Sequence, residues 1–162
     1  MNTTPFGHTQ DLFYMRKAIG QAQRAFANSE VPIGALVVAS DGTIVSRAHN
    51  QVESKKTQCA HAEILAINKA SKKRGDWRLD GCWLYVTLEP CTMCMGLIRL
   101  SRISGVVYAA DSPLFGYRHE LDIANGSRVY KRGPHIVNGV CIDEVVDLMK
   151  RFFKKKREKG SE

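Results

Sequence analysis

The chain has 162 residues, 44% of them hydrophobic, which is enough to bury a core, and we predict a single domain over residues 1–162. No stretch is apolar and long enough to span a bilayer, and the first thirty residues lack a signal-peptide pattern, so we expect a soluble, cytoplasmic protein without a membrane partner. Five cysteines, an odd number, disfavour a disulfide scaffold, and the formal net charge of +8 favours a polyanionic partner.

The first 48 residues predict a helix followed by a hairpin. Apolar side chains recur at intervals of three and four: Leu12, Met15, Ile19, Ala22 and Phe26. This spacing predicts an amphipathic helix over residues 9–28, with Thr9 as its N-terminal cap. Residues 34–39 and 43–48 are short β-prone runs separated by Ser40-Asp41-Gly42, which predicts two antiparallel neighbouring strands.

The middle of the chain alternates between the two periodicities. After a polar loop over residues 51–58, an apolar helical pattern predicts a helix over residues 61–73 that ends before Gly75. Residues 82–87 and 105–110 are predicted strands, and a helix that begins near Pro90 connects them.

The C-terminal part predicts one more strand and one more helix. Residues 135–137 form a short β-prone run, and Asp143 is a candidate cap for the last helix. The buried face of that helix is predicted to carry Val145, Val146, Met149, Phe152 and Phe153. Five strands alternating with helices indicate an α/β fold, a three-layer α/β/α sandwich with a central mixed five-stranded sheet.

Two short motifs contain the residues that point to chemistry. Cys59-Ala60-His61-Ala62-Glu63 is followed some thirty residues later by Glu89-Pro90-Cys91-Thr92-Met93-Cys94. One imidazole and two thiolates, from His61, Cys91 and Cys94, are the donors of a catalytic zinc site whose fourth position stays open for a water. Glu63 is a carboxylate that the metal does not need.

The spacing suits this chemistry. His61 falls in the first turn of a predicted helix, and Glu63, two positions later, is expected to point toward the same site without competing for the metal. Cys91 and Cys94 are three residues apart on one face of the next helix. Both ligand sets therefore lie at helix N-termini, where the helix dipole favours thiolate over thiol.

A rival interpretation uses Cys59 as a fourth ligand. Four protein donors would close the tetrahedron and make the zinc structural, with no reactive water. Such a site leaves the carboxylate of Glu63 buried near the metal without a task.

These motifs resemble the cytidine deaminase superfamily, and within it most closely the bacterial tRNA-specific adenosine deaminases. The similarity covers most of residues 8–110 and 136–157. It includes the segments 30–35 (EVPIGA), 47–50 (RAHN), 76–79 (DWRL), 84–89 (LYVTLE) and 101–103 (SRI).

The resemblance implies a cytidine-deaminase-like fold and one Zn²⁺ per subunit. It also implies hydrolytic deamination of adenosine to inosine at the wobble position (34) of a tRNA anticodon stem-loop, by a homodimer. Asn50, Ala62 and the backbone around Pro90 are then the substrate-binding groups, and Glu63 is the catalytic proton carrier. The basic end of the chain, residues 150–162, is expected to contact RNA phosphate, although a solvated helix end explains it equally simply.

The sequence departs from the family pattern at two places. Thr57-Gln58-Cys59 stands where the family usually has Asp-Pro-Thr, and residues 111–134 lack the family's lysine and small-residue run. In that second segment Phe115, Tyr117 and Arg118 are candidates to contact a base or ribose, or to form a lid packed on the protein itself.

Two other functions fit the same residues. The first is deamination of free nucleobases or nucleosides of the guanine or cytosine type, which would need a small closed pocket and no basic tail. The second is a zinc-stabilised RNA-binding module without catalysis, in which Glu63 would have no role.

Overall fold

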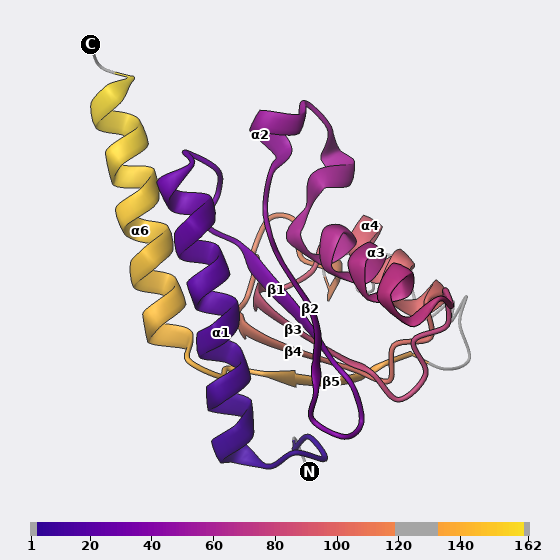
Figure 1. Cartoon of the computed structure of the whole chain (residues 1–162). Coiled ribbons are helices and arrows are strands. Elements are labelled where there is room, and N and C mark those ends of the chain that lie inside the picture. Colours follow the sequence, from indigo (N-terminus) through magenta and orange to yellow (C-terminus); the bar gives the residue numbers. More distant parts are fainter. Residues whose placement is uncertain (1–2, 119–132, 161–162) are drawn as a thin grey trace.

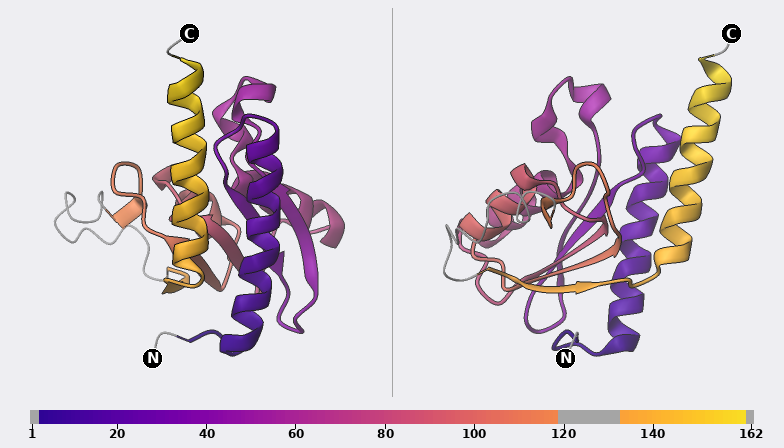
Figure 2. Two further views of the ribbon diagram at one scale, coloured as in Figure 1. Left: turned by 90° about the vertical axis from the view of Figure 1, so that its left-hand side faces the viewer. Right: turned by 180° about the vertical axis from the view of Figure 1, so that it is seen from behind.

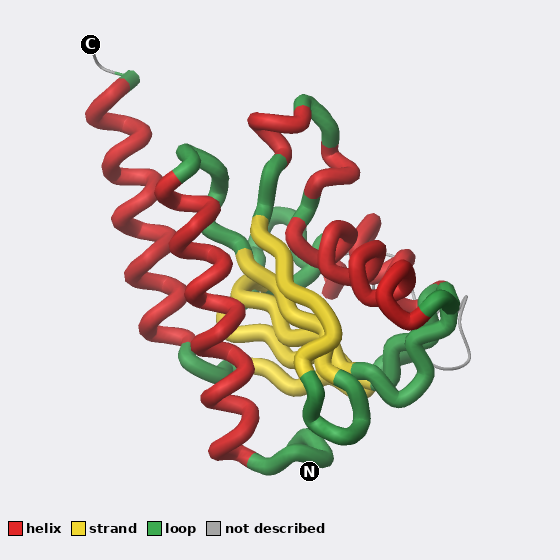
Figure 3. The backbone as a smooth tube through the Cα atoms, viewed as in Figure 1, coloured by secondary structure: helices red, strands yellow, loops and turns green. Residues whose placement is uncertain are grey.

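The computed structural model describes residues 3–118 and 133–160. Five strands form one mixed sheet in the order β2-β1-β3-β4-β5. The strands are β1 (Gly34–Val38), β2 (Ile44–His49), β3 (Trp83–Leu88), β4 (Gly105–Ala110) and β5 (His135–Asn138). The predicted α/β sandwich with a mixed five-stranded sheet is confirmed (Figure 3).

Helices cover both faces of the sheet (Figures 1 and 2). One face carries α1 (His8–Ala27) and α6 (Ile142–Lys159), and the other carries α3 (Ala62–Arg74) and α4 (Thr92–Leu100). None of these described helices is both long and apolar enough to cross a membrane.

The pairing of the strands follows from the connections between them. A short turn joins β1 to β2, so they pair antiparallel, with Gly34 opposite His49. The chain between β3 and β4 passes through α4, and these two strands pair parallel, as a helical crossover requires. Every residue of β1 and of β4 is buried, because helices lie on both sides.

Alternate residues of β1 feed two separate cores. Ala35 and Val37 pack with α3 and α4, whereas Leu36 and Val38 pack with α1. At the start of the strand, a Cβ added to Gly34 would lie 2.1 Å from the carbonyl oxygen of Ala18 in α1. This close approach of helix and strand requires glycine.

Helix ends differ from the prediction in ways that local pattern does not reveal. Gly7, not Thr9, precedes α1, and no side chain caps it. Likewise α6 begins after Cys141, which adopts a left-handed conformation, so Asp143 lies inside the first turn and is not the cap. In both cases the helix starts before the polar residue that was expected to cap it.

The predicted loop over residues 51–58 contains a short helix, α2 (Val52–Lys55), and the start of a 3₁₀ turn, Gln58–Ala60. The carboxylate of Glu30 accepts hydrogen bonds from the backbone N–H groups of Glu53, at 2.9 Å, and Ser54, at 2.7 Å. A charged acceptor more than twenty residues away therefore stabilises the first turn of α2.

Candidate metal centre

Two helix N-termini bring the predicted ligands together. His61 directly precedes α3, Cys91 directly precedes α4, and Cys94 lies in the first turn of α4. One donor atom from each of these residues lies within 4.8 Å of the other two. The Nδ1 atom of His61 is 3.4 Å from Sγ of Cys94 and 3.8 Å from Sγ of Cys91.

These separations fit a zinc ion. With Zn–S distances near 2.3 Å and Zn–N distances near 2.0–2.1 Å, tetrahedral coordination places a nitrogen and a sulfur donor roughly 3.6 Å apart. Nitrogen and sulfur donors together are also the set that zinc prefers. His61, Cys91 and Cys94, which we call the zinc triad, are therefore positioned to hold this ion.

Cys59 does not complete the triad. It is exposed, and its backbone N–H donates to Oγ1 of Thr57. Within residues 3–118 and 133–160, no further His, Cys, Asp or Glu joins the three donors. The closed four-ligand site is therefore not formed in this arrangement.

Gln58, in the segment that departs from the family pattern, orients the imidazole of His61. Its side-chain Oε1 lies 3.1 Å from Nε2 of His61. Because Nδ1 faces the two sulfurs, Nε2 carries the proton that Gln58 accepts, and this fixes the tautomer that leaves Nδ1 for the metal. Sequence pattern gave no sign of this role.

Hydrogen bonding between the two thiols shifts their pKa values in opposite directions. The pKa of Cys91 is lowered to about 4, mainly by its hydrogen bond with Cys94 and also by the neighbouring His61, although burial opposes this shift. The same bond, together with burial, raises the pKa of Cys94. At least one sulfur is thus ready to bind a metal as thiolate at neutral pH.

Glu63 is buried beside the zinc triad. Burial raises the pKa of its carboxyl group above the usual range. Its Oε2 atom is buried without a hydrogen-bond partner among the described residues, an arrangement that native proteins rarely keep without a functional reason.

His61, Cys91 and Glu63 line a cavity of about 1130 Å³. Residues that follow β4 and residues of α6 both contribute to its lining. We call this space the metal-site cavity. Its lining on the α6 side consists of Val146, Met149, Lys150, Phe153 and Arg157.

The cavity corrects one expectation for α6. Phe153, which was predicted to be buried, is exposed on the cavity wall. Lys150 and Arg157, from the basic end of the chain, line the same cavity as His61 and Cys91.

The three predicted substrate-binding residues are all buried close to the motifs. Asn50 follows β2, and its backbone N–H donates to the carbonyl of Ile33, which lines the cavity. Ala62 is the first residue of α3, where an N–H has no partner within the helix. The carbonyl of Pro90 accepts the N–H of Tyr117 at 3.0 Å, so one of its two lone pairs is used within the chain.

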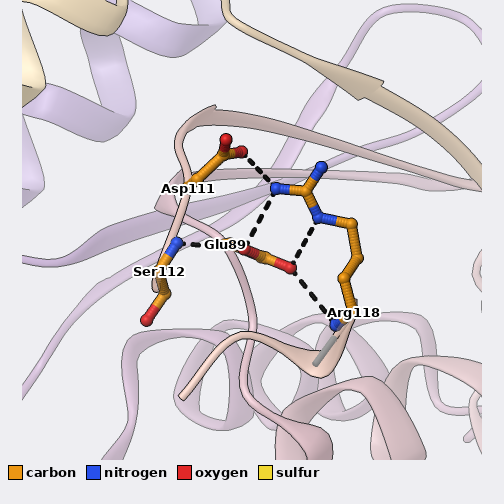
Figure 4. Close-up of polar contacts among 4 residues, drawn as sticks. All are labelled: Glu89, Asp111, Ser112 and Arg118. Atoms are coloured by element: carbon orange, nitrogen blue, oxygen red, sulfur yellow. Dashed lines mark hydrogen bonds and ion pairs between the residues drawn. The ribbon is translucent and has the colours of Figure 1, made fainter. Parts of the chain in front are cut away.

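A second buried carboxylate, that of Glu89, holds the segment after β4 in place (Figure 4). It accepts the backbone N–H of Ser112 at 2.9 Å and the Nε–H of Arg118 at 3.0 Å. Arg118 also pairs with Asp111 at 2.5 Å. This role of Glu89 could not be predicted from the sequence, because its partner Arg118 lies 29 residues away in a stretch without a clear pattern.

The three candidate residues of segment 111–118 differ in what they contact. Tyr117 is buried and Arg118 is paired with Glu89, so both pack on the protein itself. Phe115 is exposed and lines the metal-site cavity.

Three other aromatic or histidine side chains take no part in the zinc triad as far as the described residues show. Trp77 packs against Arg78 and Arg102 just after α3. His135 is not among the metal donors, and His119 lies outside the described residues.

Comparisons with known proteins agree with the motifs. The sequence model of the family described as the cytidine and deoxycytidylate deaminase zinc-binding region matches residues 8–110. A tRNA-specific adenosine deaminase of Bacillus subtilis (strain 168) is 42% identical over 151 residues, which cover 93% of this chain and 93% of that protein.

Solved structures are similar over the same region. One from a study of A-to-I editing by tRNA:A34 deaminases at the wobble position has a TM-score of 0.77 and 34% identity, and the match covers 84% of this chain and 98% of that chain. A guanine deaminase from Bacillus subtilis has a TM-score of 0.62 and 32% identity, covering 75% and 81%. The chain therefore belongs to the zinc-dependent cytidine and deoxycytidylate deaminase family and, within it, to the tRNA-specific adenosine deaminases.

Proposed function

We propose that this protein hydrolytically deaminates adenosine to inosine at the wobble position (34) of a tRNA anticodon stem-loop. The observation that carries the proposal is the zinc triad beside the buried carboxylate of Glu63, whose Oε2 atom has no hydrogen-bond partner among the described residues. The tRNA:A34 deaminase with 34% identity and the tRNA-specific adenosine deaminase with 42% identity support the choice of substrate.

One Zn²⁺ per subunit is held by His61, Cys91 and Cys94. When bound, the ion supplies Lewis-acid activation and lowers the pKa of the attacking water to about 7. Gln58 keeps the imidazole of His61 in the orientation and tautomer that binding needs.

Glu63 moves the protons. Its carboxylate takes a proton from the attacking water and delivers it to the adenine ring nitrogen. It then takes the proton of the new hydroxyl group at C6 and passes it to the amino group, which leaves as ammonia while the carbonyl of inosine forms. These transfers require a group that gains and loses protons near neutral pH, and burial raises the pKa of Glu63 in that direction.

Asn50, Ala62 and Pro90 orient the base. The amide of Asn50 offers a donor and an acceptor together to the purine edge. The N–H of Ala62 has no partner within α3 and is available to an acceptor on the substrate. The carbonyl of Pro90 keeps one lone pair for the amine that is removed.

The size of the metal-site cavity and the two cations on its α6 side favour RNA over a free nucleoside. Its volume of about 1130 Å³ exceeds the roughly 300–1000 Å³ typical of small-molecule sites. Lys150 and Arg157 in its wall suit RNA phosphate. An anticodon loop is already unpaired, so turning its base into the site costs less than extruding one from a duplex.

The likeness to the guanine deaminase supports one second candidate, deamination of free bases or nucleosides. Zinc-loaded protein would be incubated with an anticodon stem-loop and, separately, with adenosine, guanine and cytidine. We expect inosine from the stem-loop alone. Ammonia released only from the free compounds contradicts the tRNA proposal.

A Glu63→Gln variant separates the enzyme from a non-catalytic zinc module. The substitution keeps the shape of the side chain and the zinc triad but removes the proton carrier. We expect stoichiometric zinc, unchanged RNA binding, and a loss of deamination of roughly 100-fold or more. A variant with an unchanged rate contradicts the role of Glu63.

We also propose that the protein is a homodimer that pairs through α4. Two large apolar side chains of α4, Met93 and Leu100, are exposed and lie seven residues apart, about two helical turns, on the helix surface. Leu100 is 62% exposed, which is unusual for such a large apolar side chain. Sedimentation should give twice the monomer mass for the wild type and the monomer mass for Leu100→Glu.

Five free cysteines lead us to expect that the protein functions in the cytoplasm, where thiols stay reduced.

A further inference from the structure

Two large apolar side chains stand exposed at the rim of the metal-site cavity. Leu114 is 81% exposed and Phe115 is 74% exposed, and both belong to the cavity wall. They are neighbours at the tip of the turn that follows β4. Exposed apolar groups next to a functional cavity mark a surface that a ligand covers.

The turn that presents these side chains is firmly held. Figure 4 shows the carboxylate of Glu89 between Ser112 on one side and Arg118 on the other, with hydrogen bonds to both. Arg118 reaches both oxygens of Glu89 and also Asp111. The tip of the turn, which carries Leu114 and Phe115, is therefore held by hydrogen bonds on both sides.

The same segment is joined to the start of α4. Gly116 forms an isolated β-bridge with Cys91, and the N–H of Tyr117 donates to the carbonyl of Pro90. A Cβ added to Gly116 would lie 2.4 Å from the carboxylate carbon of Glu89, so the contact is tight. The position of Phe115 is thus fixed relative to the zinc triad.

An adenine at the zinc triad leaves most of the metal-site cavity unfilled, because the cavity is larger than a site for one small molecule. Phe115 lines this cavity together with Lys150 and Arg157 of α6. An aromatic face near cations is the combination that binds unpaired nucleotides, through stacking on the base and attraction of the phosphate.

We propose that Phe115 stacks on an unpaired base that directly neighbours the target adenosine, with Leu114 packing beside it. Segment 111–118 is then a rigid specificity element that reads the shape of the anticodon loop next to the reacting base. This proposal rests on the proposed function and adds to it a residue that selects the RNA.

A double-mutant cycle between protein and RNA tests the contact. The protein is zinc-loaded and carries Glu63→Gln, so that the RNA is not converted during the binding measurement. Phe115→Ala is compared with the Phe115 parent, on an intact anticodon stem-loop and on two others that lack the base immediately 5′ or 3′ of the target. Phe115 is exposed, so its removal should leave the fold intact.

We expect Phe115→Ala to weaken binding of the intact RNA roughly 5- to 100-fold, as the loss of one stacked base does. The effect should vanish on one of the two RNAs that lack a neighbouring base, because the partner of Phe115 is already gone. Phe115→Trp should restore binding and Phe115→Leu should not. Phe13→Ala, at an exposed phenylalanine (47%) on α1, is the matched control and should change nothing.

Equal affinity of Phe115→Ala and its parent for the intact RNA overturns the proposal. So does a loss of the same size on all three RNAs. If Phe115→Ala halves the sedimenting mass, the tip packs on a second copy of the chain, and the proposal also fails. A wild-type protein that still deaminates the stem-loop in these cases leaves the proposed function intact, whereas one that neither binds nor deaminates it overturns both.

Discussion

The contact between Glu89 and the segment after β4 gives a quantitative prediction. Replacing Glu89 by Gln removes the negative charge and turns one acceptor oxygen into an N–H₂ donor. That donor then faces an N–H of Ser112 or of Arg118, and a buried donor loses its partner. The side chain of Glu89 is 2% exposed, so water cannot replace the lost acceptor.

The magnitude follows from what the carboxylate holds. Hydrogen bonds to a charged group contribute about 1.5–3 kcal/mol each, and breaking a fully buried ion pair costs about 3–5 kcal/mol. Because Arg118 is 43% exposed, solvent screens its share, and we expect Glu89→Gln to cost about 2–4 kcal/mol. Arg118→Ala leaves Glu89 with the backbone N–H groups of Ser112 and Arg118, and should cost less, about 1–2 kcal/mol.

Urea unfolding of zinc-loaded protein measures both changes. With a slope near 2 kcal/mol per M, Glu89→Gln should lower the midpoint by about 1–2 M. Arg151→Ala, which breaks an exposed pair with Asp147 on α6, is the matched control and should shift the midpoint very little. The reasoning is refuted if Glu89→Gln unfolds at the wild-type midpoint, or if Arg118→Ala proves the more damaging change.

Three further predictions concern residues around the site. Gln58→Ala should weaken zinc binding about 10- to 100-fold, because the imidazole of His61 loses its hydrogen-bond acceptor. A competition titration with a chelator measures this, and an unchanged zinc affinity would show that the contact does not support the ligand. Cys59→Ser should keep one zinc per chain by elemental analysis together with wild-type activity, and loss of the metal would revive the four-ligand site. Glu30→Gln should cost about 1–3 kcal/mol at pH 7, because two backbone N–H groups of α2 lose a charged acceptor. Burial opposes ionisation of Glu30, but those hydrogen bonds outweigh the effect of burial and lower the pKa of Glu30. The contribution of Glu30 to stability is therefore complete above the unfolded pKa of about 4.3 and disappears as pH falls through the lower pKa of the folded state. A stability difference between wild type and Glu30→Gln that grows as the pH is lowered contradicts this.

Periodicity and motif spacing predicted most of the fold because they reflect short-range physics. The apolar stripe of α1 and the turn at Ser40-Asp41-Gly42 specify a helix and a hairpin without help from the rest of the chain. His61 and Cys91 could be placed at helix N-termini for the same reason. Their convergence on one point also followed, because a shared metal was the simplest explanation for both motifs.

The features that sequence reasoning missed depend on contacts between distant residues. The carboxylate of Glu30 stabilises α2 from another part of the chain, and Glu89 holds Arg118 across 29 positions. Neither contact produces a periodic pattern in the sequence. The helix caps failed for a related reason, since α1 and α6 extend past Thr9 and Asp143, the polar residues expected to cap them.

The central claim is that three side chains hold one zinc ion and that the fourth position is left for the reaction. X-ray absorption at the zinc edge, on active protein as purified, tests this most directly. The account predicts one zinc per chain with two sulfur donors, one imidazole nitrogen and one light donor that does not come from the protein. A sphere filled by four protein nitrogen and sulfur donors, or active protein without zinc, would contradict it.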